Sequence, residues 1–135
     1  MKIYYREKSG GIEILRCFGI EGRVEIPGMI DGRLVISAAP YAFSSHMDEK
    51  EELKNASLWE VSEGLGFGRE EHVLAGNDVE EIVFPYTLKE IGRYIFYGCG
   101  NLKKLEFSDS LMQIGCGAFT GCHALEKLTV HMRQG

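Results

Sequence analysis

The sequence lacks any apolar segment of about 20 residues, the length that a membrane-spanning helix needs. It also lacks a signal peptide pattern at its start, because residues 1–8 carry charges where such a peptide requires an apolar run. Both absences predict a cytoplasmic protein.

Positive charge is also scarce. The 15 Lys and Arg residues are outnumbered by 20 Asp and Glu residues, which gives a formal net charge of -5. An acidic chain repels the phosphates of DNA and RNA, so we expect no nucleic acid partner. The hydrophobic fraction of 44% and the length of 135 residues, 1–135, suit a single folded domain with one core.

Recognisable catalytic and cofactor-binding motifs are missing as well. No Gly-x-Ser-x-Gly nucleophile motif occurs, and no histidine has a carboxylate or cysteine partner at the spacing of a triad. Glycines alternate with apolar residues at 64–68, but no Walker lysine follows, and Glu70 and Glu71 would repel a phosphate. The sequence therefore predicts neither an enzyme nor a cofactor.

The feature that is present is an internal repeat across residues 79–130. Apolar residues recur every 23 residues (102 minus 79) in three sets. The sets are Val79, Leu102 and Leu125; Ile82, Leu105 and Leu128; and Phe84, Phe107 and Val130. The same step relates five further pairs, which are Leu88 and Leu111, Ile91-Gly92 and Ile114-Gly115, Phe96 and Phe119, Gly98 and Gly121, and Cys99 and Cys122. A unit of this length cannot bury its apolar face alone, so the units must stack into a solenoid.

The motif Leu-x-x-Leu-x-Phe, followed by Ile-Gly and then Phe-x-Gly-Cys, resembles the BspA-like branch of the leucine-rich repeat family. This resemblance implies a recognition surface for another macromolecule and brings no catalytic residues with it. Relatives in that family are often exported, so a cell-surface or secreted location is the alternative if the true start lies upstream. The predicted fold class is α/β: a short leucine-rich-repeat solenoid with an N-terminal β-hairpin cap and a helical insertion.

Residues 1–22 are predicted to form the cap. Two β-prone runs, 3–5 and 12–15, lie on either side of Ser9-Gly10-Gly11, whose glycines allow the positive φ of a tight hairpin turn. A repeat array exposes apolar surface at its ends, and we expect this hairpin to cover the first coil.

Residues 23–43 are predicted to form a degenerate repeat. The residue numbers of its strand and of the next regular strand differ by 58, whereas those of Phe43 and the matching Phe96 differ by 53. The difference, 58 minus 53, is five extra residues. We place them in a loop that contains Asp31-Gly32, a dipeptide typical of hairpin turns.

The insertion at residues 44–78 separates this repeat from the regular ones. Acids in the first turn, followed by Leu53, Ala56 and Trp59 at three-residue steps, predict an amphipathic helix over 48–59. We expect its apolar side to dock on the flank of the solenoid, with the acids in solvent. The alternative is that the acids form a contact patch.

Two of the four cysteines, Cys99 and Cys122, share a repeat position and should stack about 5 Å apart with parallel side chains. Parallel side chains suit a packed apolar ladder better than a disulfide, which needs them to converge. Cys116, Cys122 and His123 lack the paired close spacing of a zinc site, so we expect no metal.

Outward-facing positions alternate with the inward ones along each strand and should stack into two rows. These eight candidate partner-binding residues are Arg23, Glu81, Lys104 and Lys127 in one row, and Glu25, Val83, Glu106 and Thr129 in the next. Opposite charges, as at Glu81 and Lys104, provide cross-strand support without any ligand. An exposed sheet face of this kind is nevertheless where repeat proteins usually bind, so we predict a non-catalytic module that binds another protein there.

Two alternatives to protein binding remain open. One is a structural scaffold that orients the rest of a larger polypeptide, and the other is a thiol or metal protein. The strand expected at 125–130 begins a repeat without its second half, so we interpret the chain as the N-terminal part of a longer protein. The same uncapped coil offers a route to self-association through an unpaired strand edge.

Overall fold

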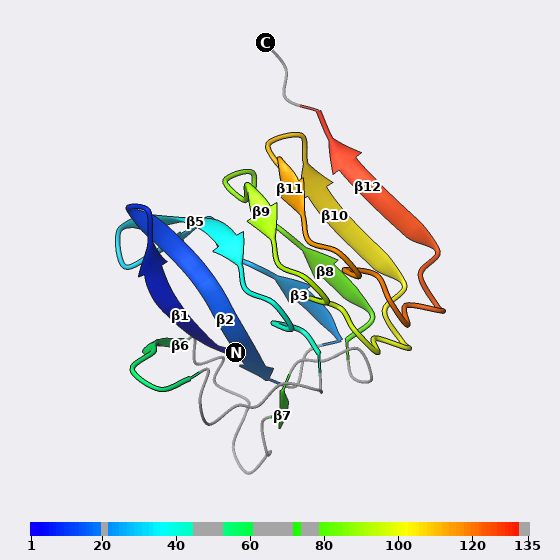
Figure 1. Cartoon of the computed structure of the whole chain (residues 1–135), viewed down its shortest axis with the longest axis horizontal. Coiled ribbons are helices and arrows are strands. Elements are labelled where there is room, and N and C mark those ends of the chain that lie inside the picture. Colours follow the sequence, from blue (N-terminus) through cyan, green and yellow to red (C-terminus); the bar gives the residue numbers. More distant parts are fainter. Residues whose placement is uncertain (20–21, 45–52, 61–71, 74–78, 133–135) are drawn as a thin grey trace.

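The structure is a computed structural model that describes residues 1–19, 22–44, 53–60, 72–73 and 79–132. Within these residues the strands build two stacked ladders on opposite sides of a short solenoid (Figure 1). The strands are β1 (Lys2–Lys8), β2 (Gly11–Gly19), β3 (Arg23–Glu25), β4 (Met29–Ile30), β5 (Arg33–Ala38), β6 (Ser57–Glu60), β7 (His72–Val73), β8 (Glu81–Val83), β9 (Glu90–Ile91), β10 (Lys104–Ser108), β11 (Gln113–Ile114) and β12 (Lys127–His131). This architecture confirms the prediction of a short leucine-rich-repeat-like solenoid with stacked strands.

One ladder is a parallel sheet in the order β12-β10-β8-β3. Its register pairs Glu81 with Lys104 and Lys104 with Lys127, so the residue number rises by the repeat step of 23 each time. Arg23 pairs with Glu81, an offset of 58 in residue number (81 minus 23). The stacking register that the sequence predicts is therefore confirmed for this sheet.

The second ladder has the order β11-β9-β5-β2-β1-β6, with β4 paired to β5 and β7 paired to β2. Ile91 pairs with Ile114 at a step of 23, and Ala38 pairs with Ile91 at an offset of 53 (91 minus 38). The first coil is thus five residues longer than the register requires, 58 minus 53, and β4 and β5 form a hairpin within it. Asp31 and Gly32 make its turn with φ angles of 51° and 79°, as the sequence predicts.

Apolar side chains from both ladders meet in the core between them. Phenylalanine rings stack from coil to coil, with Phe84 on Phe107 at a centroid distance of 5.0 Å and Phe96 on Phe119 at 5.8 Å. Phe43 extends the second stack into the first coil, 6.1 Å from Phe96. Stacked aromatic pairs contribute about 0.5–1.5 kcal/mol each beyond their buried area, so the rings reinforce the register of the coils.

Two repeated glycines allow neighbouring coils to approach closely. A Cβ atom on Gly92 would lie 2.3 Å from the backbone nitrogen of Pro40 in the preceding coil. On Gly115 it would lie 2.2 Å from the backbone nitrogen of Arg93. Both distances are below any real contact between these atoms. The repeat therefore requires glycine in its Ile-Gly motif, because the stacked backbones leave no room for a side chain there.

The N-terminal hairpin is present as the sequence predicts. β1 and β2 pair antiparallel, and their two-residue turn has φ angles of 51° at Ser9 and 81° at Gly10. Positive φ at both positions matches the right-handed twist of the strands. β2 also pairs in parallel with β5, so the hairpin extends the second ladder past the first coil.

The helix predicted over 48–59 is wrong for the residues that the structure describes. Residues 57–60 form β6, which pairs antiparallel with β1 and sets Trp59 opposite Ile3; residues 48–52 lie outside the described part. The backbone hydrogen bonds offered by the edge of β1 outweigh a modest local helix propensity. The described residues therefore lack the α component of the predicted class, and they include no helix long and apolar enough to cross a membrane.

Candidate interaction face

The outward face of the four-stranded sheet brings all eight candidate residues together. Along the strands, the inward Val24, Ile82 and Leu105 are at most 1% exposed, whereas their neighbours on either side are half-buried or exposed. Parallel pairing places Arg23, Glu81, Lys104 and Lys127 in one row and Glu25, Val83, Glu106 and Thr129 in the next. Adjacent residues of a row are thus separated only by the strand spacing of about 4.8 Å.

In the half of this face nearest the cap, one arginine forms ion pairs with two glutamates. The Arg23 guanidinium lies 2.6 Å from Glu25 Oε1 and 3.4 Å from Glu81 Oε2. The hydrogen bond to Glu25 raises the pKa of Arg23 further above its ordinary value. Because all three side chains are at least partly in solvent, these pairs organise the surface more than they stabilise the fold.

In the other half, two lysines are adjacent. Lys104 and Lys127 are direct partners across β10 and β12. Glu81, which the sequence suggests as the partner of Lys104, contacts Arg23 instead, and Glu106 lies 3.2 Å from His131 Nε2. Among the residues described, neither lysine forms an ion pair.

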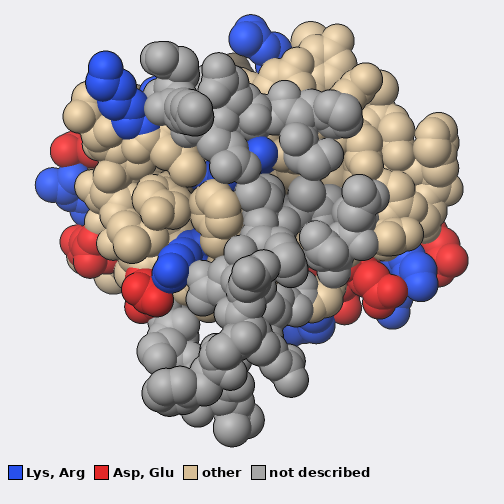
Figure 2. Space-filling view, turned by 90° about the horizontal axis from the view of Figure 1, so that it is seen from below, with Lys and Arg blue, Asp and Glu red and all other residues tan. Residues whose placement is uncertain are grey.

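The charged side chains on the face seen from below are mixed in sign. Figure 2 shows Lys and Arg interspersed with Asp and Glu around the face seen from below, without a large area of one sign among the residues drawn in colour. A nucleic acid backbone binds to a continuous stripe of basic side chains. The residues drawn in colour on this face form no such stripe.

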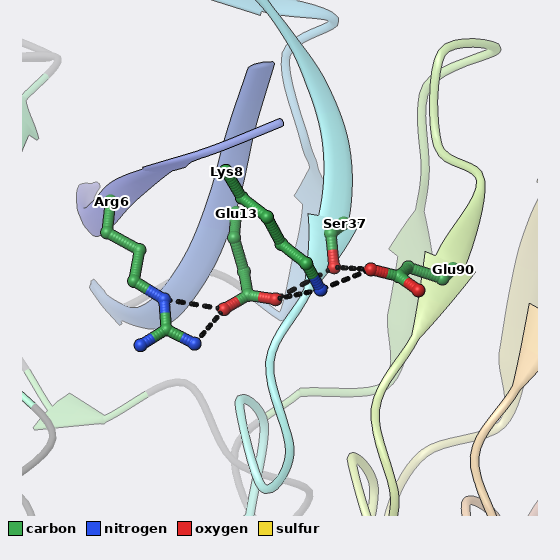
Figure 3. Close-up of polar contacts among 5 residues, drawn as sticks. All are labelled: Arg6, Lys8, Glu13, Ser37 and Glu90. Atoms are coloured by element: carbon green, nitrogen blue, oxygen red, sulfur yellow. Dashed lines mark hydrogen bonds and ion pairs between the residues drawn. The ribbon is translucent and has the colours of Figure 1, made fainter. Parts of the chain in front are cut away.

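A second polar cluster lies on the other ladder and joins the cap to the repeats (Figure 3). The Glu13 carboxylate is 3% exposed and accepts hydrogen bonds from Arg6 Nε at 2.8 Å and from Lys8 Nζ at 3.0 Å. Lys8 Nζ also contacts Glu90 Oε1. The Ser37 hydroxyl lies 2.9 Å from Glu13 and 3.1 Å from Glu90, and its single proton can be donated to only one of them at a time.

The electrostatics of this cluster favour the charged forms. Burial alone would raise the pKa of Glu13, but hydrogen bonds from Lys8, Ser37 and Arg6 outweigh burial and lower it. The hydrogen bond between Lys8 and Glu90 raises the pKa of Lys8 and lowers that of Glu90. Sequence analysis missed this cluster. The available signal was the position of Lys8 and Glu13 on opposite strands of a predicted hairpin.

Cys99 and Cys122 occupy equivalent positions in successive coils, as the repeat predicts. Cys99 is buried and its thiol lies 3.2 Å from the carbonyl oxygen of Phe43, while the half-buried Cys122 thiol lies 3.4 Å from that of Phe96. A hydrogen bond with Cys99 lowers the pKa of Cys122. Among the described residues, neither of these thiols forms a disulfide, and neither do the buried Cys17 and the exposed Cys116. In the described segments no three His, Cys, Asp or Glu side chains converge as metal ligands.

Comparison with known proteins gives a family and a fold. Residues 70–134 match the family model described as a BspA type leucine rich repeat region. The chain is similar to a leucine rich cell surface protein from Faecalibacterium prausnitzii A2-165, with a TM-score of 0.61 and 20% identity over 96% of this chain and 30% of that chain. It also matches the Leucine Rich Repeat protein of T. pallidum, with 22% identity, a TM-score of 0.38, and coverage of 96% and 83%. No curated protein matches the sequence.

Proposed function

Residues 70–134 belong to the BspA-type leucine-rich repeat family, and from this premise we propose that the chain is a non-catalytic module that binds another protein. The binding surface is the outward face of β3, β8, β10 and β12. The observation that carries the proposal is the arrangement of eight outward side chains in two rows, held in register by parallel pairing.

A surface of this kind suits recognition for a physical reason. Its side chains stand on backbone that is already ordered, since β8 and β10 are hydrogen-bonded on both sides and rest on the buried rings of Phe84 and Phe107. A partner that binds here does not have to order the backbone, which reduces the free-energy cost of association. The charged and polar composition of the rows then provides specificity more than raw affinity.

The test uses peptides displayed as a library and selected on the immobilised chain. Two arginines introduced into the face, V83R/T129R, should abolish binding of most selected peptides, because they place bulky charged side chains at two of the four positions of the second row, on β8 and β12. The matched control is Q113R/T120R, which adds the same charge at exposed positions outside the two rows. Peptides that bind V83R/T129R as well as they bind the wild type would move the site away from this face.

A second candidate function is self-association through the last coil. The apolar repeat positions Ile114, Leu128 and Val130 are 55%, 52% and 50% exposed, although the equivalent Ile91, Leu105 and Phe107 are at most 3% exposed. β11 and β12 are also the edges of their sheets, and an exposed apolar edge is a template for pairing.

Light scattering after size exclusion tests this association. The wild type should show a concentration-dependent rise in mass, and L128K/V130K should remain monomeric. L34K/L58K is the matched control, since Leu34 and Leu58 are 47% and 46% exposed but lie elsewhere. A wild-type chain that stays monomeric at high concentration would exclude the dimer.

The location of the protein is part of the same proposal. The similar structure from F. prausnitzii is described as a cell surface protein, and this chain spans about 30% of its length. That likeness supports a cell-surface or secreted location over the cytoplasmic one predicted from the charged start of the sequence. Protease treatment of intact cells that express the natural gene tests it, because a surface protein is cleaved and a cytoplasmic one is protected.

A further inference from the structure

We propose that Lys104 and Lys127 form a carboxylate-binding pair, which takes an aspartate or glutamate side chain from an extended acidic peptide segment of the partner. This inference rests on the proposed function, because it assigns the partner's chemistry at one place on the same face. The first observation is the register. The two lysines are direct partners on neighbouring parallel strands, so their Cα atoms are separated by about the strand spacing of 4.8 Å.

Like charges at directly opposed positions destabilise a sheet. A carboxylate next to the two cations offsets such repulsion, because pairs of opposite charge on neighbouring strands are favourable. Here the nearby carboxylates are engaged elsewhere: Glu81 contacts Arg23 at 3.4 Å, and Glu106 contacts His131 at 3.2 Å. Within the described part of the chain, the lysine pair is left without an ion-pair partner. A carboxylate from outside the chain would relieve the repulsion, and its two oxygens offer one acceptor to each ammonium group.

The preceding lysine on the same coil differs from this pair, because it has a carboxylate partner within the chain. Lys103, one residue before Lys104, lies 3.5 Å from Glu80 of the preceding coil. Thr129, two residues beyond Lys127 on the same outward face, is half-buried and adds a hydroxyl donor beside the pair. The local surface therefore offers two cations and a neutral donor to a carboxylate, next to Glu106, whose own carboxylate contacts His131.

The remaining charges decide between an acidic peptide and a longer polyanion. Glu25, Glu81 and Glu106 lie on the same face, and the whole chain carries a net charge of -5. A nucleic acid or sulfated polysaccharide would bring many anionic groups close to these carboxylates, and repulsion would oppose its binding. An extended peptide can place one carboxylate at the lysine pair and neutral residues next to the glutamates.

The experiment is an NMR titration of the isotope-labelled chain with three probes. The first is the acetylated and amidated peptide Thr-Glu-Thr-Glu-Thr, the second is its Thr-Gln-Thr-Gln-Thr counterpart, and the third is a uridine oligonucleotide. We expect the glutamate peptide alone to shift the amide signals of residues 104–106 and 127–129. K104Q/K127Q should weaken that binding at least about tenfold, without lowering the melting temperature. The control K89Q/K103Q removes the same charge at exposed positions off the pair and should leave the affinity within about twofold.

Four results would overturn the lysine pair: no shift with the glutamate peptide, equal shifts with the glutamine peptide, equal weakening by both double variants, or tighter binding of the oligonucleotide. Equal weakening would identify long-range charge as the cause, and preference for the oligonucleotide would identify a polyanion site. These failures are separable from failure of the proposed function. If V83R/T129R abolishes binding of the selected peptides while K104Q/K127Q has no effect, the face remains the binding site and only the lysine pair is excluded.

Discussion

The ring of Tyr94 fills the space that a side chain on residue 117 would need. A Cβ atom added to Gly117 would lie 2.3 Å from Cε1 of Tyr94, which belongs to the preceding coil. The backbone at Gly117 is left-handed, with φ of 67°, and the equivalent Tyr94 and Tyr41 have φ of 52° and 61°. The same strained turn therefore recurs in three coils. The Tyr94 ring stacks on the Tyr41 ring at a centroid distance of 5.6 Å. In the third coil, the Tyr94 ring leaves room only for glycine.

This contact predicts the outcome of a double-mutant cycle. G117A should lower the free energy of unfolding by about 1–3 kcal/mol, because it combines left-handed strain with a clash against the Tyr94 ring. In a Y94A background the same substitution should cost only the strain, about 1 kcal/mol. Chemical denaturation of the four proteins measures the difference. Equal costs in both backgrounds would show that the ring does not restrict residue 117.

The two stacked rings Phe96 and Phe119 should differ in their contribution to stability. F96A should cost about 3–5 kcal/mol, as deletion of a fully buried aromatic does. Phe119 occupies the equivalent position but is only half-buried in the last coil, so F119A should cost about 1–3 kcal/mol. Urea denaturation gives both values. A larger loss for F119A than for F96A would mean that the last coil is covered in solution.

The Glu13 cluster predicts how stability depends on pH. Glu13 and Glu90 have pKa values below the ordinary 4.5 in the folded chain, so the unfolded chain binds more protons near that pH. Their stabilisation is present above about pH 4.5 and is lost as the pH falls through the folded pKa values. The Lys8 pKa is raised above 10.5, so its stabilisation is present below that pH and is lost above it.

Replacing Glu13 tests this dependence. E13Q should cost about 1–3 kcal/mol near pH 7 and should flatten the loss of stability in acid, because it removes a buried hydrogen-bonded charge. The control is E7Q, since Glu7 forms an exposed ion pair with Arg33 at 2.8 Å. Such pairs contribute under about 1 kcal/mol. Thermal unfolding from pH 3 to 7 follows both variants, and an unchanged acid limb in E13Q would contradict the assignment.

Trp59 fluorescence reports whether residues 57–60 form a strand in solution. Trp59 is half-buried and packs against the core, whereas the preceding Leu58 is 46% exposed. Neighbouring residues of a strand point to opposite faces. The wild type should therefore emit at shorter wavelength than free indole and resist iodide, and the indole of L58W/W59F should emit at longer wavelength and be quenched freely. Identical spectra for the two proteins would argue against β6.

The stacking of the coils could be predicted from sequence because each coil repeats the same backbone path. Positions that face the core, such as Ile82 and Leu105, recur as apolar residues at a fixed step. Gly92 and Gly115 recur because adjoining backbones leave no room for a side chain. These are constraints that every coil imposes on its own segment, so they are visible in the local pattern.

The parts that sequence analysis missed depend on contacts between distant segments. Local propensity favours a helix at Trp59, and only the presence of the β1 edge at Ile3 makes it a strand. The two rows of the interaction face were predictable, but the pairing of their charges was not. Glu81 has a basic neighbour on each side, Arg23 and Lys104, and the sequence alone does not determine which one it contacts.

In the regular coils both ladders share the same step of 23 residues, so this part of the molecule can change its length only by whole repeats. Deleting one whole repeat between β8 and β10 would rejoin the chain in phase, keep every later side chain on its present face, and shorten the stack by one strand spacing of about 4.8 Å. A deletion one residue longer or shorter that is rejoined within a strand would turn the rest of that strand over, so that its lysines enter the core and its leucines face water. The distance from the cap to the last coil can therefore change only in whole units, while the hairpin of β4 and β5 can lengthen by any number of residues.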